Sequence, residues 1–159
     1  MLQMNPQELL KEADGQASSW MRNNPEVIYL NETVKVAAKL FSDLAVDFLP
    51  VVGESMNPAG IITPKAILKA CLNGETETSI VNYISQEDFS IIRTDEFIID
   101  FYNMPYSYFF AVNENQQLKG VLTRKEIQQC LSFYMKELTQ TSHTAEVLDV
   151  ILESAYEGV

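Results

Sequence analysis

The sequence predicts an α+β fold in which two tandem βαββα repeats pack with pseudo-two-fold symmetry, flanked by N- and C-terminal helices. Three observations predict this fold. Apolar residues make up 47% of the 159 residues, as in ordinary folded domains. Short β-type runs and helical stripes follow the order strand, helix, strand, strand, helix, and this order occurs twice. Finally, residues 60–67 (GIITPKAI) align without gaps on residues 120–127 (GVLTRKEI).

A helical lead is expected over residues 1–21, because Asn5 and Pro6 suit the start of a helix. Trp20 on this lead is interpreted as a packing residue. The first repeat is assigned to residues 22–78. Its expected elements are a strand at 27–30, a helix from 33, strands at 48–52 and 60–63, and a helix from 64 that ends at Asn73-Gly74.

The second repeat is assigned to residues 79–138. Its expected elements are a strand at 89–92, a helical stretch at 97–102 that stops near Pro105, strands at 108–112 and 118–123, and a helix at 125–138. A polar link follows, and then an amphipathic helix that needs a partner. We expect residues 139–159 to connect to a further domain.

Composition excludes several classes of function. A net charge of −11 without a basic cluster argues against nucleic-acid binding. Cys71 and Cys130 lie beside leucines in helical patterns and are interpreted as small buried hydrophobes, so neither a disulfide nor a metal site is expected. With His143 as the single histidine, zinc or triad chemistry is not predicted. No apolar run reaches the ~20 residues of a membrane span, and the polar, acidic N-terminus is not a signal peptide. The sequence predicts a cytoplasmic protein that is not an enzyme.

The runs at residues 49–52 (LPVV), 60–63 (GIIT) and 120–126 (GVLTRKE) resemble the CBS domain family, and their duplication resembles a tandem CBS pair, or Bateman module, over about residues 20–138. The resemblance implies a module that binds an adenosine-containing nucleotide, such as AMP, ADP, ATP or S-adenosylmethionine, between the repeats. It also implies that the module relays occupancy to an attached domain. No cofactor is required.

The family's ribose-binding signature is Gly, two apolar residues, Thr or Ser, two variable residues and Asp. The second repeat resembles it with Gly120, Thr123 and the longer acid Glu126. The first repeat has Thr63 but Ala66, which cannot accept a hydrogen bond from ribose. We therefore expect the second cleft to be the better nucleotide site. Unchanged nucleotide affinity in a Glu126→Ala variant would contradict this.

A second interpretation of Thr123 and Glu126 needs no ligand. Thr-x-x-Glu is also a helix capping box, in which the threonine accepts the N–H of residue 126 and the glutamate accepts the N–H of residue 123. Thr63 followed by Pro64 likewise suits a helix start. The sequence leaves capping and ligand binding both open.

By the same resemblance, the entry strand and the segment before the middle strand line the base-binding slot of each repeat. In the second repeat these residues are Ile84, Ser85, Phe89, Ile91 and 106–109, which include Ser107 and Tyr108; in the first they are Pro25, Val27, Val46, Asp47 and Phe48. Most of them also suit a simple core. Arg22, Arg93 and Arg124 are the available phosphate partners or, alternatively, solvated surface charges.

The run at residues 148–159 resembles the lead-in to a PAS sensor domain. Joined to the CBS resemblance, it implies the N-terminal sensory piece of a bacterial PAS-containing or sigma-54-dependent transcriptional regulator. We expect a homodimer that uses its end helices to pass a signal. The alternative is a CBS-like scaffold that binds no ligand and only dimerises, which Ala66 favours and the Thr123–Glu126 pair opposes.

Overall fold

A computed structural model describes residues 13–138 of the chain. The expected lead helix before Ala13, the polar link, the C-terminal helix and the PAS-like run all lie outside the described residues. The elements, in order, are η1 (Ala13–Gly15), α2 (Ala17–Trp20), β1 (Arg22–Asn23), β2 (Ile28–Tyr29), α3 (Val34–Asp43), β3 (Leu49–Val52), β4 (Pro58–Ile62), α4 (Pro64–Leu72), η2 (Ile80–Tyr83), β5 (Phe89–Arg93), η3 (Ile98–Asp100), β6 (Tyr108–Val112), β7 (Leu118–Thr123) and α5 (Arg124–Leu138).

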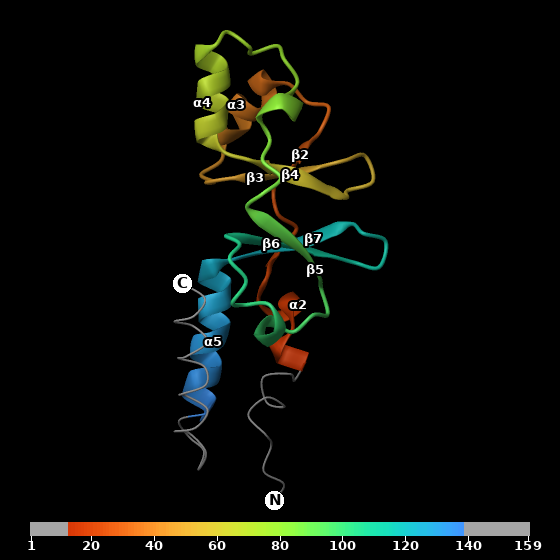
Figure 1. The fold of residues 1–159 in the computed structure, drawn as a ribbon, viewed down its shortest axis with the longest axis vertical. Coiled ribbons are helices and arrows are strands. Elements are labelled where there is room, and N and C mark those ends of the chain that lie inside the picture. The colour runs from red at the N-terminus through yellow and green to blue at the C-terminus, as the bar shows by residue number, and fades with distance from the viewer. Residues whose placement is uncertain (1–12, 139–159) are drawn as a thin grey trace, which may run out of the picture.

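Two units are stacked with their sheets facing each other and their helices at the outer ends (Figure 1). The first unit has a three-stranded sheet in the order β2-β3-β4, covered by α3 and α4. The second has a four-stranded sheet in the order β1-β7-β6-β5, covered by α2 and α5. Each sheet contains one parallel pair (β2 with β3, β5 with β6) and one antiparallel hairpin (β3 with β4, β6 with β7). The predicted α+β fold of duplicated units is confirmed.

Apolar faces explain why the two units associate. Each unit has its own core between sheet and helices, and a third cluster lies between the two sheets. This inter-sheet cluster consists of buried Val52, Ile61, Phe110, Leu118 and Val121, with half-buried Val27, Phe48, Met56, Phe89 and Tyr108 packed against it. Because a short sheet covered by helices on one face leaves the other exposed to water, stacking the two sheets buries both remaining faces.

The segment that leads into each unit lies against the last strand of the other unit, an exchange that the sequence did not reveal. Strand β1 pairs antiparallel with β7, so that Arg22 lies opposite Val121. Correspondingly, Ser85 forms an antiparallel bridge with Ile61 of β4 through two backbone hydrogen bonds of 2.8 and 2.9 Å. The chain segments that would carry the base-binding residues of one repeat therefore cross to the other.

The repeated glycines permit this crossing. A Cβ on Gly60 would lie 2.9 Å from the carbonyl oxygen of Ser85, and a Cβ on Gly120 would lie 2.3 Å from Sδ of Met21. Both distances are shorter than carbon atoms tolerate without displacing a neighbour. The glycine of each repeated segment thus has a packing reason that does not involve a ligand.

The helical stretch expected at residues 97–102 is wrong: the structure has only the single 3-10 turn η3. Phe97 is extended and forms a backbone bridge with Gln16, which prevents an earlier helix start, and Phe101 already leaves helical dihedral angles. Ile98, Phe101 and Tyr102 are nevertheless buried on one side of the turn. The second unit thus replaces a helix with one apolar turn.

Trp20 packs as expected. Its ring lies 5.7 Å from that of Phe133 on α5, and its Nε1–H donates to the carbonyl of Asp14 at 2.7 Å. The lead segment is thereby fixed to the second unit, although the sequence assigned it to a separate domain.

Candidate functional site

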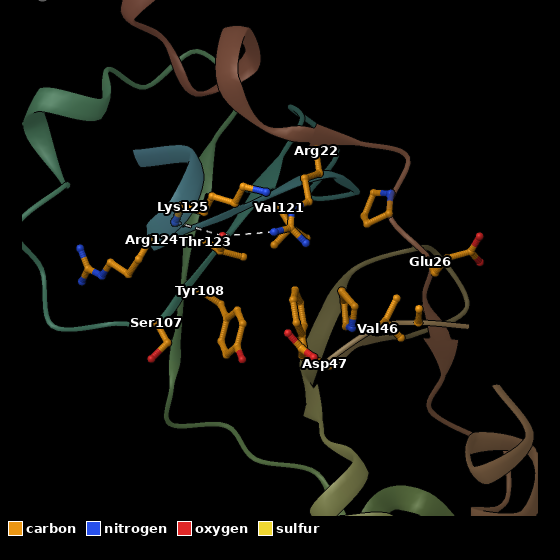
Figure 2. Close-up of a pocket in the computed structure, with 14 residues that line it drawn as sticks. Arg22, Glu26, Val46, Asp47, Ser107, Tyr108, Val121, Thr123, Arg124 and Lys125 are labelled. Carbon is orange, nitrogen blue, oxygen red and sulfur yellow. Dashed lines mark hydrogen bonds between the residues drawn. The ribbon is translucent and has the colours of Figure 1, made fainter. Parts of the chain in front are cut away.

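A cavity of about 540 Å³ opens where the two units meet (Figure 2). It is lined from the first unit by the segment before β3, from the second by the start of β6 and the β7–α5 junction, and by the crossing lead segment. The lining residues are Arg22, Pro25, Glu26, Ala45, Val46, Asp47, Phe48, Pro50, Ser107, Tyr108, Val121, Thr123, Arg124 and Lys125.

Glu126 is the only buried charged or polar residue among residues 13–138, with 4% of its surface exposed. Its Oε1 accepts hydrogen bonds from the backbone N–H and the hydroxyl of Thr123 at 2.8 and 2.7 Å. Arg22 covers the outer side of this carboxylate, with Nε 3.2 Å from Oε1 and Nη2 3.3 Å from Oε2. A buried carboxylate is costly unless paired and hydrogen-bonded, and these contacts satisfy it fully.

Arg22 also reaches Thr123, whose Oγ1 accepts from Nη2 at 3.4 Å; Figure 2 shows the guanidinium directed toward this threonine. The Arg22 side chain is about half exposed, at 51%, while that of Glu126 is 6% exposed. The arginine therefore lies between the carboxylate and the cavity.

One half of the predicted capping box is present. Glu126 accepts the N–H of Thr123, but the Thr123 hydroxyl accepts the N–H of Lys125 at 3.3 Å rather than that of residue 126. In the first unit, Thr63 caps α4 fully: its hydroxyl accepts the N–H of Ala66 at 3.3 Å, and Pro64 occupies the first helical turn. The interpretation of Thr63 as a helix cap is confirmed.

Two aromatic rings from opposite units form one wall of the cavity. The rings of Phe48 and Tyr108 lie 4.2 Å apart at 41°. Burial raises the pKa of the Tyr108 hydroxyl, the carboxylates of Asp88 and Asp47 raise it further, and Arg22 opposes them. Figure 2 shows Asp47 beside Tyr108, so a carboxylate of the first unit lies near this tyrosine of the second.

The three arginines predicted as phosphate partners have different environments. Arg93 pairs with Asp95 at 3.0 Å and lies outside the cavity. Arg124 lines the cavity but donates to the carbonyls of Tyr102 and Met104, and its guanidinium lies 5.5 Å from the ring of Phe109. Burial lowers the pKa of Arg124, and Asp88 partly offsets this. Arg22 is held by Glu126, as described above.

The structure brings only some of the predicted site residues together. Phe48, Ser107, Tyr108 and Thr123 line the cavity, and Glu126 lies directly behind it. The others lie elsewhere: Gly120 packs on Met21, Ile84 and Ser85 lie against β4, Ile91 is 47% exposed on β5, Thr63 caps α4, and Val27 packs between the sheets.

We expected Ile84 and Ser85 to lie with Thr123, and this prediction is wrong. The exchange of lead segments places both against β4 of the first unit, where Ser85 lies opposite Ile61, and Arg22 takes the corresponding place opposite Val121 of β7. Lys125 and Glu26 also line the cavity, although the sequence did not single them out. No periodic signal could have found them, because both are exposed residues at chain junctions.

Within the described residues, no group of three or more metal-ligating side chains is positioned to hold an ion, and no helix of that part of the chain is long and apolar enough to cross a bilayer.

Comparisons with known proteins agree with this architecture. Residues 17–73 match the family described as the CBS domain. A CBS domain-containing protein of unknown function from Bacillus anthracis str. Ames Ancestor superposes with a TM-score of 0.70 at 16% identity, covering 80% of this chain and 99% of that one. A CBS domain protein from Streptococcus pneumoniae TIGR4 gives 0.65 at 19% identity, covering 82% and 92%.

A third similar structure is CbpB in complex with c-di-AMP, with a TM-score of 0.67 at 14% identity, covering 84% of this chain and 95% of that one. No curated protein matches the sequence. At these identities the similarity establishes the fold. The chain therefore contains a segment, residues 17–73, that matches the CBS domain family, within a fold that it shares with CBS-domain proteins.

Proposed function

We propose that the chain is a non-catalytic regulatory module that binds an adenosine-containing nucleotide in the cavity between its two units. The observation that carries this proposal is that both units and the crossing lead segment line one cavity of about 540 Å³. A ligand in this position contacts both units at once. Its binding energy then depends on how the units are placed relative to each other, which is the requirement for relaying occupancy.

The lining suits the parts of a nucleotide. The Phe48–Tyr108 pair offers an aromatic surface to a base. The hydroxyls of Ser107 and Thr123 lie on the second-unit side, where a sugar would be held. Lys125 and Arg22 supply positive charge to the lining. These residues are the proposed ligand contacts.

The similar structure of CbpB contains c-di-AMP, so this dinucleotide joins AMP, ADP, ATP and S-adenosylmethionine as candidate ligands. The proposal includes a cytoplasmic homodimer and an output domain on the same chain, of the PAS-containing or sigma-54-dependent class that residues 148–159 resemble.

The alternative function is a ligand-free dimerisation scaffold, and one observation favours it. Thr123 and Arg22 already satisfy the Glu126 carboxylate, and with 6% of its side chain exposed it offers little surface to ribose. The first repeat lacks the acid altogether, with Ala66 in its place.

Calorimetric titration and thermal shift with the five candidate ligands test the function. A ligand that binds the folded state raises the melting temperature by mass action. We expect Ala45→Trp, at an exposed position that lines the cavity, to abolish binding without loss of folding. The matched control is Ser42→Trp, exposed on α3 outside the lining. Absence of binding by all five ligands, or equal binding by the Ala45→Trp variant, contradicts the proposal.

A further inference from the structure

The Arg22–Glu126 pair joins two residues that are 104 positions apart and belong to the exchanged lead segment and to α5. Among the described contacts, Nε of Arg22 contacts Glu126, and its Nη2 donates to both Glu126 and Thr123. A guanidinium carries five N–H donors in a fixed plane, and two of them belong to Nη1. In the described part of the chain, Nη1 has no protein partner.

The pair also sets the position of the guanidinium. The carboxylate is itself held by the N–H and hydroxyl of Thr123 at 2.8 and 2.7 Å, so it is a rigid acceptor at the end of β7. A half-exposed arginine without such an acceptor loses rotamer entropy when it binds a ligand. Here the folded chain has already ordered it at the cavity wall.

We infer that Arg22, positioned by Glu126, is the anion-recognising residue of this cavity, and that the ligand it selects carries a phosphate group. This inference rests on the proposed function for the nucleoside part of the ligand, but the anion site can be tested without it. In this arrangement Glu126 touches no ligand and acts as a positioning residue. Glu126 thus contributes to anion binding only by positioning Arg22, a residue that the sequence assigned to the first repeat.

The other charged residues that line the cavity are of both signs. Lys125 lines the cavity and makes no ion pair with any described residue. Glu26 and Asp47 also line the cavity and repel a phosphate. In a chain of net charge −11, a phosphate ester finds favourable potential only where cations gather.

Inorganic pyrophosphate is the probe for the anion site alone. Titration followed by the Arg22 Nε–Hε NMR signal should shift that signal in the wild type. We expect Arg22→Met and Glu126→Gln to weaken pyrophosphate binding about tenfold or more, the loss typical of a charge-assisted hydrogen bond. Arg93→Met is the matched control, because Arg93 pairs with Asp95 outside the cavity, and it should retain wild-type affinity.

A conservative substitution of Glu126 distinguishes a role in positioning Arg22 from a role in folding alone. Glu126→Asp retains the charge and should recover part of the affinity that Glu126→Gln loses, while melting temperatures report whether each variant folds. Absence of an Arg22 signal shift in the wild type, or unchanged affinity in Arg22→Met, overturns the inference.

Parallel titrations with AMP and adenosine distinguish this inference from the proposed function. Tighter binding of AMP than of adenosine, abolished by Arg22→Met, supports both. Equal binding of the two leaves the nucleotide function standing and refutes the anion site. Binding of pyrophosphate but of none of the five candidate ligands supports the anion site and refutes the nucleotide function.

Discussion

Gly120→Ala tests whether the exchanged lead segment holds the two units together as the structure shows. The added Cβ would lie 2.3, 2.5 and 2.9 Å from Sδ, Cγ and Cε of Met21. Contacts between such atoms are optimal at ~3.5–4.0 Å, so Met21 has to leave its place. Overpacking of this kind costs about 1–3 kcal/mol of unfolding free energy.

The cost should depend on Met21. In a Met21→Ala background the space above Gly120 is empty, and Gly→Ala in an extended strand then changes the free energy of unfolding only slightly, or raises it by about 0.4–1 kcal/mol through the unfolded state. We therefore expect a coupling of about 1–2 kcal/mol between the two positions, within the range of contacting pairs.

Urea denaturation of the wild type, the two single variants and the double variant measures this coupling through their midpoints. Gly60→Ala is the contrast. Its Cβ would lie 2.9 Å from the Ser85 carbonyl oxygen, which also accepts the N–H of Ile61, so truncating a side chain cannot relieve the clash. Additive effects of Gly120→Ala and Met21→Ala would refute the close approach of the lead segment to β7.

Two further predictions concern single residues. Thr63→Ala should lower the free energy of unfolding by about 1 kcal/mol because α4 loses its N-cap, whereas Thr63→Ser should retain stability; equal loss in both, measured by urea denaturation, would contradict a capping role. Burial raises the pKa of the Cys130 thiol from 9.0 to about 12, with a further contribution from Asp14. Between these values the native state binds the proton more tightly than the unfolded chain, so stability is complete below pH 9 and falls as pH rises toward about 12. Cys130→Ala should flatten this alkaline decline, while Cys71→Ala, at a half-buried position on α4, should not; a decline unchanged in Cys130→Ala would show that another group causes it.

The strands and most helices could be predicted because their signals are local. Alternating or continuous apolar runs marked β3, β6 and β7, and Thr63-Pro64 marked the start of α4. The segment at 97–102 was mistaken because its apolar spacing is that of a helix, while the backbone bridge from Phe97 to Gln16 limits it to one turn. That bridge joins distant parts of the chain, and no local pattern reports it.

Local signals likewise identified only part of the candidate site. The sequence identified Thr123, Tyr108 and Phe48, which do line one cavity, because they flank recognisable strands. On the assumption that each repeat builds its own slot, it grouped Ile84 and Ser85 with Thr123 and Tyr108 and assigned Phe48 to the other slot. The structure places Ile84 and Ser85 beside β4, since the lead segment of each unit pairs with the last strand of the other.

The sequence alone determined the duplicated frame of this protein. Hydrophobic periodicity, turn residues and the repeated Gly-x-x-Thr segment are local properties, and they act wherever the chain folds. Only the tertiary structure decided which unit each lead segment joins, and with it the environment of Glu126. Arg22 reaches that buried carboxylate from 104 positions away, because backbone pairing of β1 with β7 places it there. A long-range ion pair of this kind depends on the fold as a whole, so the chemistry at the cavity wall was fixed by topology and not by the motif itself.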